Sequence, residues 1–263
     1  MASNLFRGLG HSQLYKTFRP VYPNAVYETI ASYCKSGLEP GMNLAVDVGC
    51  GSGQSSLPLA NYFQEVVGID VSETQIDQAP DVPGVCFRVG QAESLDFLKD
   101  NSVDLVTIAQ AMHWVNTEKF YTEVNRVLKP GGSLVAYGYT IPEVDQPEAK
   151  DVIEQFFKKT LEQYWEPGRQ HIHESFRKFS LPFPGWVRND NLHMDKFWTV
   201  DEFTGYLSTA SAWQSLKKVH PESDELHNIH ERLQSLLFSG GEERVVFRWP
   251  IFMLMGKKPH CNN

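Results

Sequence analysis

Hydrophobic residues in the first half of this chain fall into short runs separated by amphipathic segments. The apolar runs predict β-strands at residues 43–48, 65–70, 84–89, 103–109 and 133–137, and the first of them is expected to be buried. Apolar positions at helical spacing predict helices at residues 25–33, 54–63 and 117–128. Strands that alternate with helices indicate βαβ units and a parallel sheet.

The second half has a different pattern. Residues 141–240 are rich in helix formers and aromatic residues, and strand character returns at 244–249 and 251–255. The two late strands predict a hairpin that adds an antiparallel edge. We therefore expect an α/β fold with a Rossmann-like, mostly parallel seven-stranded sheet and an antiparallel C-terminal edge strand. Residues 1–263 are expected to form one domain, with an N-terminal helical segment (1–40) and a helical insertion (141–240) that caps the substrate.

Composition narrows the range of partners. The formal charge of −8 argues against a general nucleic-acid binder, and no apolar run is long enough to span a membrane. Four widely spaced cysteines predict free thiols rather than a disulfide framework. The first residues lack the apolar core of a signal peptide, so we expect a cytoplasmic protein. The pattern is compatible with a monomer or a homodimer.

The most informative segment follows the first predicted strand and reads D-x-G-x-G-x-G from Asp47 to Gly53. Glycine allows a tight turn and close approach of a ligand to the backbone, and the next helix presents free N–H groups. The dinucleotide pattern G-x-G-x-x-G fails, because Gln54 or Ser56 stands where the third glycine belongs. The phosphate-loop pattern fails because no Gly-Lys-Ser/Thr follows.

An acidic residue supports a nucleoside ligand. Asp70 ends the second predicted strand, at the distance where a carboxylate accepts hydrogen bonds from ribose hydroxyls. With the glycine turn, Gln91-Ala92-Glu93 and the Leu128–Gly132 turn, this arrangement resembles the class I S-adenosylmethionine-dependent methyltransferases. The resemblance implies S-adenosyl-L-methionine as cofactor and S-adenosyl-L-homocysteine as product. In that family the backbone N–H at the Ala92 position and a neighbouring side chain read the adenine edge, and Gln91 replaces the usual aspartate.

Three segments resemble the trans-aconitate methyltransferase-like branch: Tyr15–Pro23 (Y-x-x-x-R-P-x-Y-P), Gln110–Trp114 and Trp198–Ser211. Arg19 is a candidate for the methionine carboxylate of the cofactor, because a guanidinium fork suits a carboxylate. Equally, Arg19 and its prolines would fix only the path of the N-terminal segment. The expected cofactor-binding residues are Tyr15, Arg19, Asp47, Gly49, Gly51, Gly53, Asp70, Val71, Gln91, Ala92, Glu93, Ala109 and Gln110.

His113 and Trp114 lie just beyond the fourth predicted strand, where open α/β sheets bind ligands. Trp114 is expected to form a pocket wall, and His113 to orient the acceptor or take its proton. The alternative is a packed histidine beside a core tryptophan. The branch implies a small-molecule acceptor, such as a carboxylic acid that becomes a methyl ester. Arg169, Arg177 and Lys178 are candidate cations for such an acid.

Other interpretations remain open from the sequence. The histidine pairs at 171–173 and 227–230 lack a carboxylate or thiol complement, so we expect no metal. A dehydrogenase is disfavoured by the missing third glycine. A non-catalytic S-adenosylmethionine-binding regulator or scaffold, and a methyltransferase acting on protein or RNA, use nearly the same motifs, because fold does not fix substrate.

Overall fold

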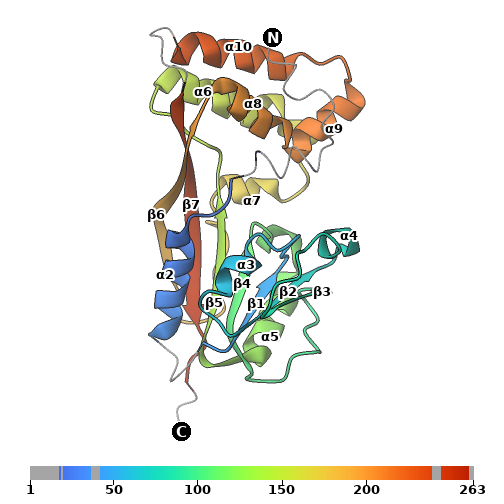
Figure 1. Cartoon of the computed structure of the whole chain (residues 1–263), viewed down its shortest axis with the longest axis vertical. Helices are drawn as coiled ribbons and strands as arrows, with labels where there is room; N and C mark the ends of the chain where they lie inside the picture. Colours follow the sequence, from blue (N-terminus) through green and yellow to red (C-terminus); the bar gives the residue numbers. More distant parts are fainter. Residues whose placement is uncertain (1–17, 19, 37–41, 239–243, 261–263) are drawn as a thin grey trace. The chain divides into compact units, whose positions relative to one another are not determined.

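The computed structural model describes residues 18, 20–36, 42–238 and 244–260, and Figure 1 shows their arrangement in helices and strands. They form two compact units. The larger unit contains the described residues of Tyr22–Tyr139, His171–Leu192 and Ile251–Asn263. The smaller unit contains those of Met1–Val21, Thr140–Gln170 and His193–Pro250. Among the described residues, no helix has the length and apolarity needed to cross a membrane.

A seven-stranded sheet has the strand order β3-β2-β1-β4-β5-β7-β6. The strands are β1 (Leu44–Val48), β2 (Glu65–Asp70), β3 (Val85–Val89), β4 (Val103–Ala109), β5 (Leu128–Tyr139), β6 (Val187–Trp198) and β7 (Val245–Lys257). Strands β1 to β5 pair in parallel, and β7 runs antiparallel to β5. The predicted α/β fold, with a mostly parallel sheet and antiparallel C-terminal strands, is confirmed.

The helices follow the expected order in the first half. The helical elements are α2 (Asn24–Lys35), α3 (Ser56–Leu59), α4 (Glu73–Ile76), η2 (Met112–Trp114), α5 (Thr117–Val127), α6 (Pro147–Gln155), η3 (Phe156–Thr160), η4 (Glu162–Tyr164), α7 (Arg169–His173), α8 (Val200–Ser208), α9 (Ser211–Val219) and α10 (Glu225–Leu237). Helix α5 shows why such a segment is helical. Asn116 caps its N-terminus by accepting a hydrogen bond from the Lys119 N–H, and Phe120, Val124 and Val127 form its buried stripe.

The two faces of the parallel strands in the larger unit carry different side chains. Val46 and Val48 of β1 pack in one hydrophobic cluster with Phe120 of α5. Asp47 lies between these valines and points to the opposite face, because side chains alternate along a strand. On that face Asp47 accepts a hydrogen bond from Ser56 of α3. Helix α5 therefore covers one face, and the start of α3 lies against the other.

The predicted C-terminal hairpin is wrong. Strand β7 continues from Val245 to Lys257 through Pro250, with no turn between the two apolar runs. Proline lacks an N–H donor, but a strand tolerates it where that donor is not needed. The Pro250 carbonyl still accepts a hydrogen bond from the Thr140 N–H. The proline therefore suggested a turn that the backbone does not make.

Three more local differences appear. Strand β6 occupies residues 187–198, inside the segment expected to be helical. It is an edge strand with one fully buried residue, so it lacks the apolar run that marks a core strand. Helix α3 covers only Ser56–Leu59 of the predicted helix at 54–63. Strand β5 begins at Leu128, before the expected break at residues 129–132, with an irregular register against β4.

Aromatic side chains form the centre of the smaller unit. The rings of Phe203 in α8 and Phe247 in β7 stack with centroids 4.0 Å apart. Trp249 is fully buried and meets Trp198 and Tyr206 edge to face. Helix α10 packs against α6 and α8, and Figure 1 shows these three helices side by side.

Candidate functional site

The strand order reverses between β1 and β4, whose chain continuations β2 and β5 lie on opposite sides of the pair. Open α/β sheets bind ligands at the carboxyl ends of the strands at such a switch point. The glycine turn follows β1, Asp70 ends β2 and Gln110 follows β4. The fold therefore brings together three predicted site segments that are well separated in sequence.

All three glycines of the turn have left-handed backbone angles, with φ of +67° at Gly49, +56° at Gly51 and +91° at Gly53. A Cβ on Gly49 would lie 2.6 Å from the Ala111 Cβ, and one on Gly53 would lie 2.5 Å from the Phe87 ring. A Cβ on Gly51 would meet nothing closer than 3.7 Å. The outer two glycines are needed for packing, whereas the middle one leaves its backbone open to a ligand.

The Asp70 carboxylate joins the glycine turn to the end of β2 through hydrogen bonds. Its Oδ2 accepts a hydrogen bond from the Gly51 N–H at 2.9 Å, and its Oδ1 accepts one from the Ser72 N–H at 2.9 Å. Each carboxylate oxygen has a second lone pair, so both can still accept bonds from hydroxyl groups. The neighbouring Val71 is 71% exposed and offers an apolar surface beside the carboxylate.

Asp47 lies beneath the turn and is fully buried. One carboxylate oxygen accepts a hydrogen bond from Ser56 Oγ at 2.6 Å, and the other accepts one from Thr107 Oγ1 at 2.8 Å. Loss of hydration raises the pKa of Asp47 from 3.8 to about 6, against the opposing effect of the two hydroxyls. Both carboxylate oxygens accept hydrogen bonds from side chains of the protein, so Asp47 is suited to supporting the glycine turn.

The raised pKa gives a prediction for Asp47→Asn. Because the folded-state pKa lies above the unfolded value, ionisation of Asp47 costs stability as pH rises from about 4 to above 6. The variant has no such cost. Two pKa units correspond to about 3 kcal/mol, so the variant should gain roughly that much relative to the parent between pH 4 and pH 7.5. Urea unfolding at both pH values measures it; an equal difference at the two pH values would contradict the prediction.

The adenine-reading segment expected at residues 91–93 follows β3. Gln91 is exposed, and the Ala92 side chain is buried. The Glu93 carboxylate accepts a hydrogen bond from the Asn116 N–H at 2.6 Å, which joins this segment to the start of α5. The segment is therefore fixed on one side by the same residue that caps α5.

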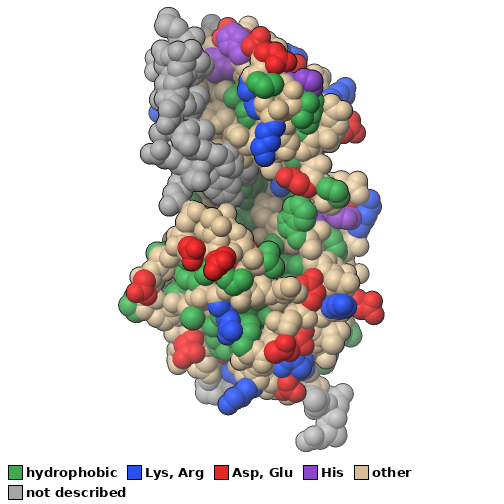
Figure 2. All heavy atoms as spheres, turned by 90° about the vertical axis from the view of Figure 1, so that its right-hand side faces the viewer, with side chains coloured by type: hydrophobic (Ala, Val, Ile, Leu, Met, Phe, Trp, Pro, Cys, Tyr) green, Lys and Arg blue, Asp and Glu red, His purple; other side chains and the backbone are tan. Residues whose placement is uncertain are grey.

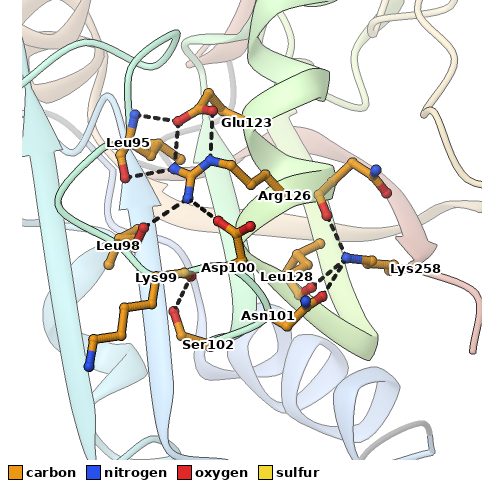
Figure 3. A network of polar contacts seen from close by, with 11 residues as sticks. Leu95, Leu98, Lys99, Asp100, Asn101, Ser102, Glu123, Arg126, Leu128 and Lys258 are labelled. Carbon is orange, nitrogen blue, oxygen red and sulfur yellow. Dashed lines mark hydrogen bonds and ion pairs between the residues drawn. The ribbon is translucent and has the colours of Figure 1, made fainter.

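Arg126 of α5 holds the loop that follows this segment, as Figure 3 shows. Its Nε and Nη2 bind the two oxygens of Glu123 at 2.9 and 2.8 Å. Its remaining N–H groups reach the carbonyls of Leu95 and Leu98 at 3.0 and 2.9 Å and the Asp100 carboxylate at 2.8 Å. All five guanidinium donors are thus used. Hydrogen bonding to the Arg126 guanidinium also holds the pKa of Glu123 below its usual range.

Gln110 has a left-handed backbone, with φ of +55°, which is uncommon for a residue other than glycine. Its Nε2 donates a hydrogen bond to the Tyr139 carbonyl at 3.1 Å. A carbonyl can only accept, so the other amide atom must be the oxygen. That Oε1 is buried and has no hydrogen-bond partner in the described part of the chain. Strain and an unpaired acceptor at one residue are typical of a ligand site.

His113 and Trp114 form the short helix η2 beyond β4. The Trp114 side chain is 59% exposed, which is unusual for so large an apolar ring. The His113 ring lies 4.7 Å from the Trp114 ring and 6.4 Å from that of Phe176. Ser175 and the fully buried Phe176 have left-handed φ angles of +55° and +56°. A strained turn thus holds an aromatic ring close to His113.

Some predicted residues fall elsewhere. Tyr15 and Arg19 lie outside the described residues. The three candidate cations all have other contacts: the Arg169 guanidinium lies over the Trp165 ring, Arg177 pairs with Asp190, and Lys178 pairs with Glu174. Within the described ranges, no group of three or more His, Cys, Asp or Glu side chains is placed to hold a metal ion.

Two further residues lie beside this region: Phe176, which the sequence marked only as one of several aromatic residues of the insertion that could form an apolar lid, and Arg188, which sequence reasoning missed. Phe176 sits in its strained turn against the Phe252 ring, with centroids 4.8 Å apart. The Arg188 guanidinium lies 5.9 Å from the same ring. The strained backbone of Phe176 was not predicted, because no glycine or other turn residue marks it in the sequence. A strand prediction for β6 would have brought Arg188 next to β7, but the polar sequence of β6 did not give one.

The fold and the site define the class of this protein as a class I S-adenosylmethionine-dependent methyltransferase. Residues 46–136 match the methyltransferase domain family. A protein from Dictyostelium discoideum, named as a methyltransferase, is 33% identical over 251 residues, which cover 94% of this chain and 93% of its own. The chain therefore belongs to the methyltransferase family, whose cofactor is S-adenosylmethionine.

Two further proteins are similar. A protein from Saccharomyces cerevisiae, named as an S-adenosylmethionine-dependent methyltransferase, is 33% identical over 146 residues, which cover 52% of this chain and 49% of its own. The solved structure of a protein described as a type II methyltransferase from Anaeromyxobacter dehalogenans is 35% identical in sequence. Its TM-score is 0.81, and the match covers 92% of this chain and all of that one.

Proposed function

We propose that this methyltransferase acts on a small-molecule acceptor, in the manner of the trans-aconitate methyltransferase-like branch, and that a carboxylic acid converted to its methyl ester is the first acceptor class to test. One observation carries the proposal. The exposed Trp114 and its neighbour His113 follow directly from β4, whose carboxyl end also presents the strained Gln110. An apolar ring, a polar ring and an unpaired acceptor are therefore grouped beside the glycine turn.

The residues present fit the adenosine half of S-adenosylmethionine. The Asp70 oxygens keep lone pairs for the two ribose hydroxyls while they hold the turn. The exposed Val71 would cover one face of the adenine, and the backbone N–H of Ala92 and the Gln91 side chain would meet its edge. A Cβ built on Gly51 would touch only the side-chain oxygens of Gln75 and Gln54, at 3.7 and 3.8 Å, so only these two flexible side chains lie where a ligand would approach the backbone.

Polar groups at the carboxyl end of β4 fit the methionine half. Gln110 Oε1 is an acceptor without a partner among the described residues, and an ammonium group is a suitable donor for it. The Ala109 backbone at the same strand end is the second expected contact. Gly49 and Gly53 would act indirectly, because their missing side chains let the turn pack against Ala111 and Phe87.

The bound cofactor supplies a methyl group already activated on a sulfonium cation. The work left to the chain is to position the acceptor in line with that group and to exclude water. Trp114 would form a wall of the acceptor site, and His113 would orient the acceptor. A carboxylate is ionised at neutral pH, so such an acceptor needs no general base. With a carboxylate acceptor, His113 would therefore position the acceptor and would not act as a general base.

Nucleic acid fits the surface poorly. The formal charge is −8, and Figure 2 shows acidic and basic side chains interspersed on the face that it draws rather than a gathered basic patch. Binding to a phosphate backbone requires clustered Lys and Arg. We therefore place small molecules before RNA, with transfer to protein as a separate outcome of the assay.

Calorimetric titration with S-adenosylhomocysteine, and separately with NAD, tests the cofactor assignment. We expect binding of the first and none of the second. Asp70→Asn removes the anionic acceptor and should weaken S-adenosylhomocysteine binding by about 10- to 100-fold, since hydrogen bonds to a charged group contribute roughly 1.5–3 kcal/mol. Glu65→Gln, at the exposed start of the same strand, is the matched control and should bind like the parent.

A labelled-methyl assay then tests the acceptor. Small carboxylic acids are compared with their neutral esters, a protein extract and total RNA. Label recovered as a base-labile ester of a small acid supports the proposal. Transfer to protein or RNA alone would overturn the small-molecule assignment, and failure of well-folded protein to bind S-adenosylhomocysteine would overturn the cofactor site.

A further inference from the structure

We propose that Arg188 is a specificity-determining residue that binds an anionic group on the acceptor, at the end remote from the methylated atom. The inference rests on the proposed small-molecule activity and goes beyond it by naming the residue and the charge that it selects. Every residue that carries the argument belongs to the larger unit.

The guanidinium of Arg188 has an unused buried donor. Arg188 is the second residue of β6, and only 19% of its side chain is exposed. Its Nε donates a hydrogen bond to the Asp190 carboxylate at 2.7 Å. Its Nη2 is buried and has no hydrogen-bond partner among the described residues. A buried cationic donor without an acceptor is costly, so this atom marks the place of an acceptor oxygen.

The local charge balance also favours an anion. The Asp190 carboxylate forms ion pairs with two cations, Arg188 at 2.7 Å and Arg177 at 3.6 Å. Two guanidinium groups and one carboxylate leave the cluster with one uncompensated positive charge. Arg177 is 68% exposed and can be solvated by water, whereas Arg188 is mostly buried. The uncompensated charge therefore matters most at Arg188, whose Nη2 still lacks an acceptor among the described residues.

Phe252 connects Arg188 to the candidate acceptor site. The Arg188 guanidinium lies 5.9 Å from the centroid of the Phe252 ring, and the Phe176 ring meets that ring edge to face. A Cβ built on Gly138 would lie 2.6 Å from Phe252 Cζ and 3.3 Å from Gln110 Oε1. The tip of the Phe252 ring and the unpaired oxygen of Gln110 thus border the same point. One aromatic ring separates the carboxyl end of β4 from the cation.

This arrangement defines a class of acceptor. An acceptor would place its reacting end near Gln110 and its anionic end at Arg188, on either side of the almost fully buried Phe252 ring. The guanidinium fork suits a carboxylate or a phosphate equally in geometry. Both are anionic oxygen groups, so the test includes each.

The experiment compares Arg188→Gln and Arg188→Lys with the parent. Lys99→Gln is the matched control, because it removes one positive charge from an exposed side chain in the same unit. With S-adenosylhomocysteine saturating, calorimetry measures binding of phenylacetate, glutarate and phenyl phosphate, each beside a neutral counterpart (methyl phenylacetate, dimethyl glutarate, phenol). Labelled methyl transfer gives KM and kcat for each probe that serves as an acceptor.

We expect the parent to bind at least one anionic probe more tightly than its neutral counterpart. Arg188→Gln should weaken that binding, or raise KM, by about 10- to 100-fold with a smaller change in kcat, and Arg188→Lys should recover part of the loss. Lys99→Gln should stay within about twofold of the parent. Binding of S-adenosylhomocysteine should stay within about twofold in all variants. The class of the anion that responds distinguishes a carboxylate from a phosphate acceptor.

Several results would overturn the inference. They are a parent that binds none of the anionic probes, an equal loss for anionic and neutral probes, and unfolding of both Arg188 variants by near-ultraviolet circular dichroism. Methylation of neutral acceptors that Arg188→Gln leaves unchanged would refute Arg188 while the proposed function stands. Absence of S-adenosylhomocysteine binding in the parent would instead refute the proposed function.

Discussion

Replacing Gly49 by alanine is expected to abolish S-adenosylhomocysteine binding and to lower the free energy of unfolding by about 3 kcal/mol. The left-handed backbone at φ +67° costs an alanine roughly 1–2 kcal/mol. Its Cβ would also lie 2.6 Å from the Ala111 Cβ, and overpacking of this kind costs about 1–3 kcal/mol. Ala111 follows Gln110, so relief of the collision would displace the carboxyl end of β4. Calorimetry and urea unfolding measure the two effects.

Alanine substitutions at two other glycines distinguish the backbone cost at Gly49 from the cost of the steric collision. Gly185 has φ of +75°, and no atom of the described residues lies within 4 Å of a built Cβ, so Gly185→Ala should show the backbone cost alone and bind S-adenosylhomocysteine normally. Gly51→Ala should resemble Gly185→Ala in stability, because its nearest neighbour is 3.7 Å away. It should nevertheless weaken binding, because the methyl group would stand on the side of the turn that the ligand is expected to approach. Normal binding by Gly49→Ala would contradict this account.

Replacing Arg126 by alanine is expected to lower the free energy of unfolding by about 3 kcal/mol. The change leaves the Leu98 carbonyl without its donor and removes one of the two donors of the Leu95 carbonyl. It also removes both guanidinium bonds from the largely buried Glu123, which keeps only the bond from the Leu95 N–H. Breaking a buried charged pair by removing one partner costs roughly 3–5 kcal/mol. The lower part of that range applies, because 28% of the Arg126 side chain is exposed. Thermal and urea unfolding give the measurement.

Asp100→Asn is the control for Arg126, because Asp100 is 70% exposed and its pair with the arginine should contribute less than about 1 kcal/mol. The lowered pKa of Glu123 adds a pH signature. Its stabilising effect is present above the ordinary carboxylate pKa and is lost as pH falls through the lower folded-state value. Arg126→Ala should remove that dependence. A variant as stable as the parent would show that water replaces the guanidinium without cost.

Local patterns were sufficient for the parallel part of the fold. The five apolar runs and the helices between them correspond to β1 to β5 and to α2, α3 and α5, although α3 is shorter than expected. A buried strand is mostly apolar, and glycine is favoured where φ is positive, so both leave marks in the sequence. The D-x-G-x-G-x-G turn and Asp70, with Gln91-Ala92-Glu93 and the Leu128–Gly132 turn, carried the resemblance that implied the cofactor class.

The antiparallel strands β6 and β7 were harder to predict from the sequence. Pro250 divides the apolar residues of β7 into two runs that suggest a hairpin, yet the backbone continues as one strand. β6 is an edge strand with mostly polar and exposed residues, so no apolar run marks it. Pairing of these strands depends on long-range contacts with β5 and with each other. Local propensity does not encode such contacts.

The sequence by itself determined the parallel sheet and the glycine turn, because strand burial and left-handed turns constrain which residues stand at each position. The resemblance of these segments to a known family implied the class of cofactor. Only the tertiary structure decided the individual roles. It placed Asp47 beneath the turn, left Gln110 Oε1 unpaired among the described residues, and brought Arg188 from β6 over the Phe252 ring of β7. These roles depend on burial and on partners far away in the chain, and neither is fixed by the residue type or its neighbours in sequence.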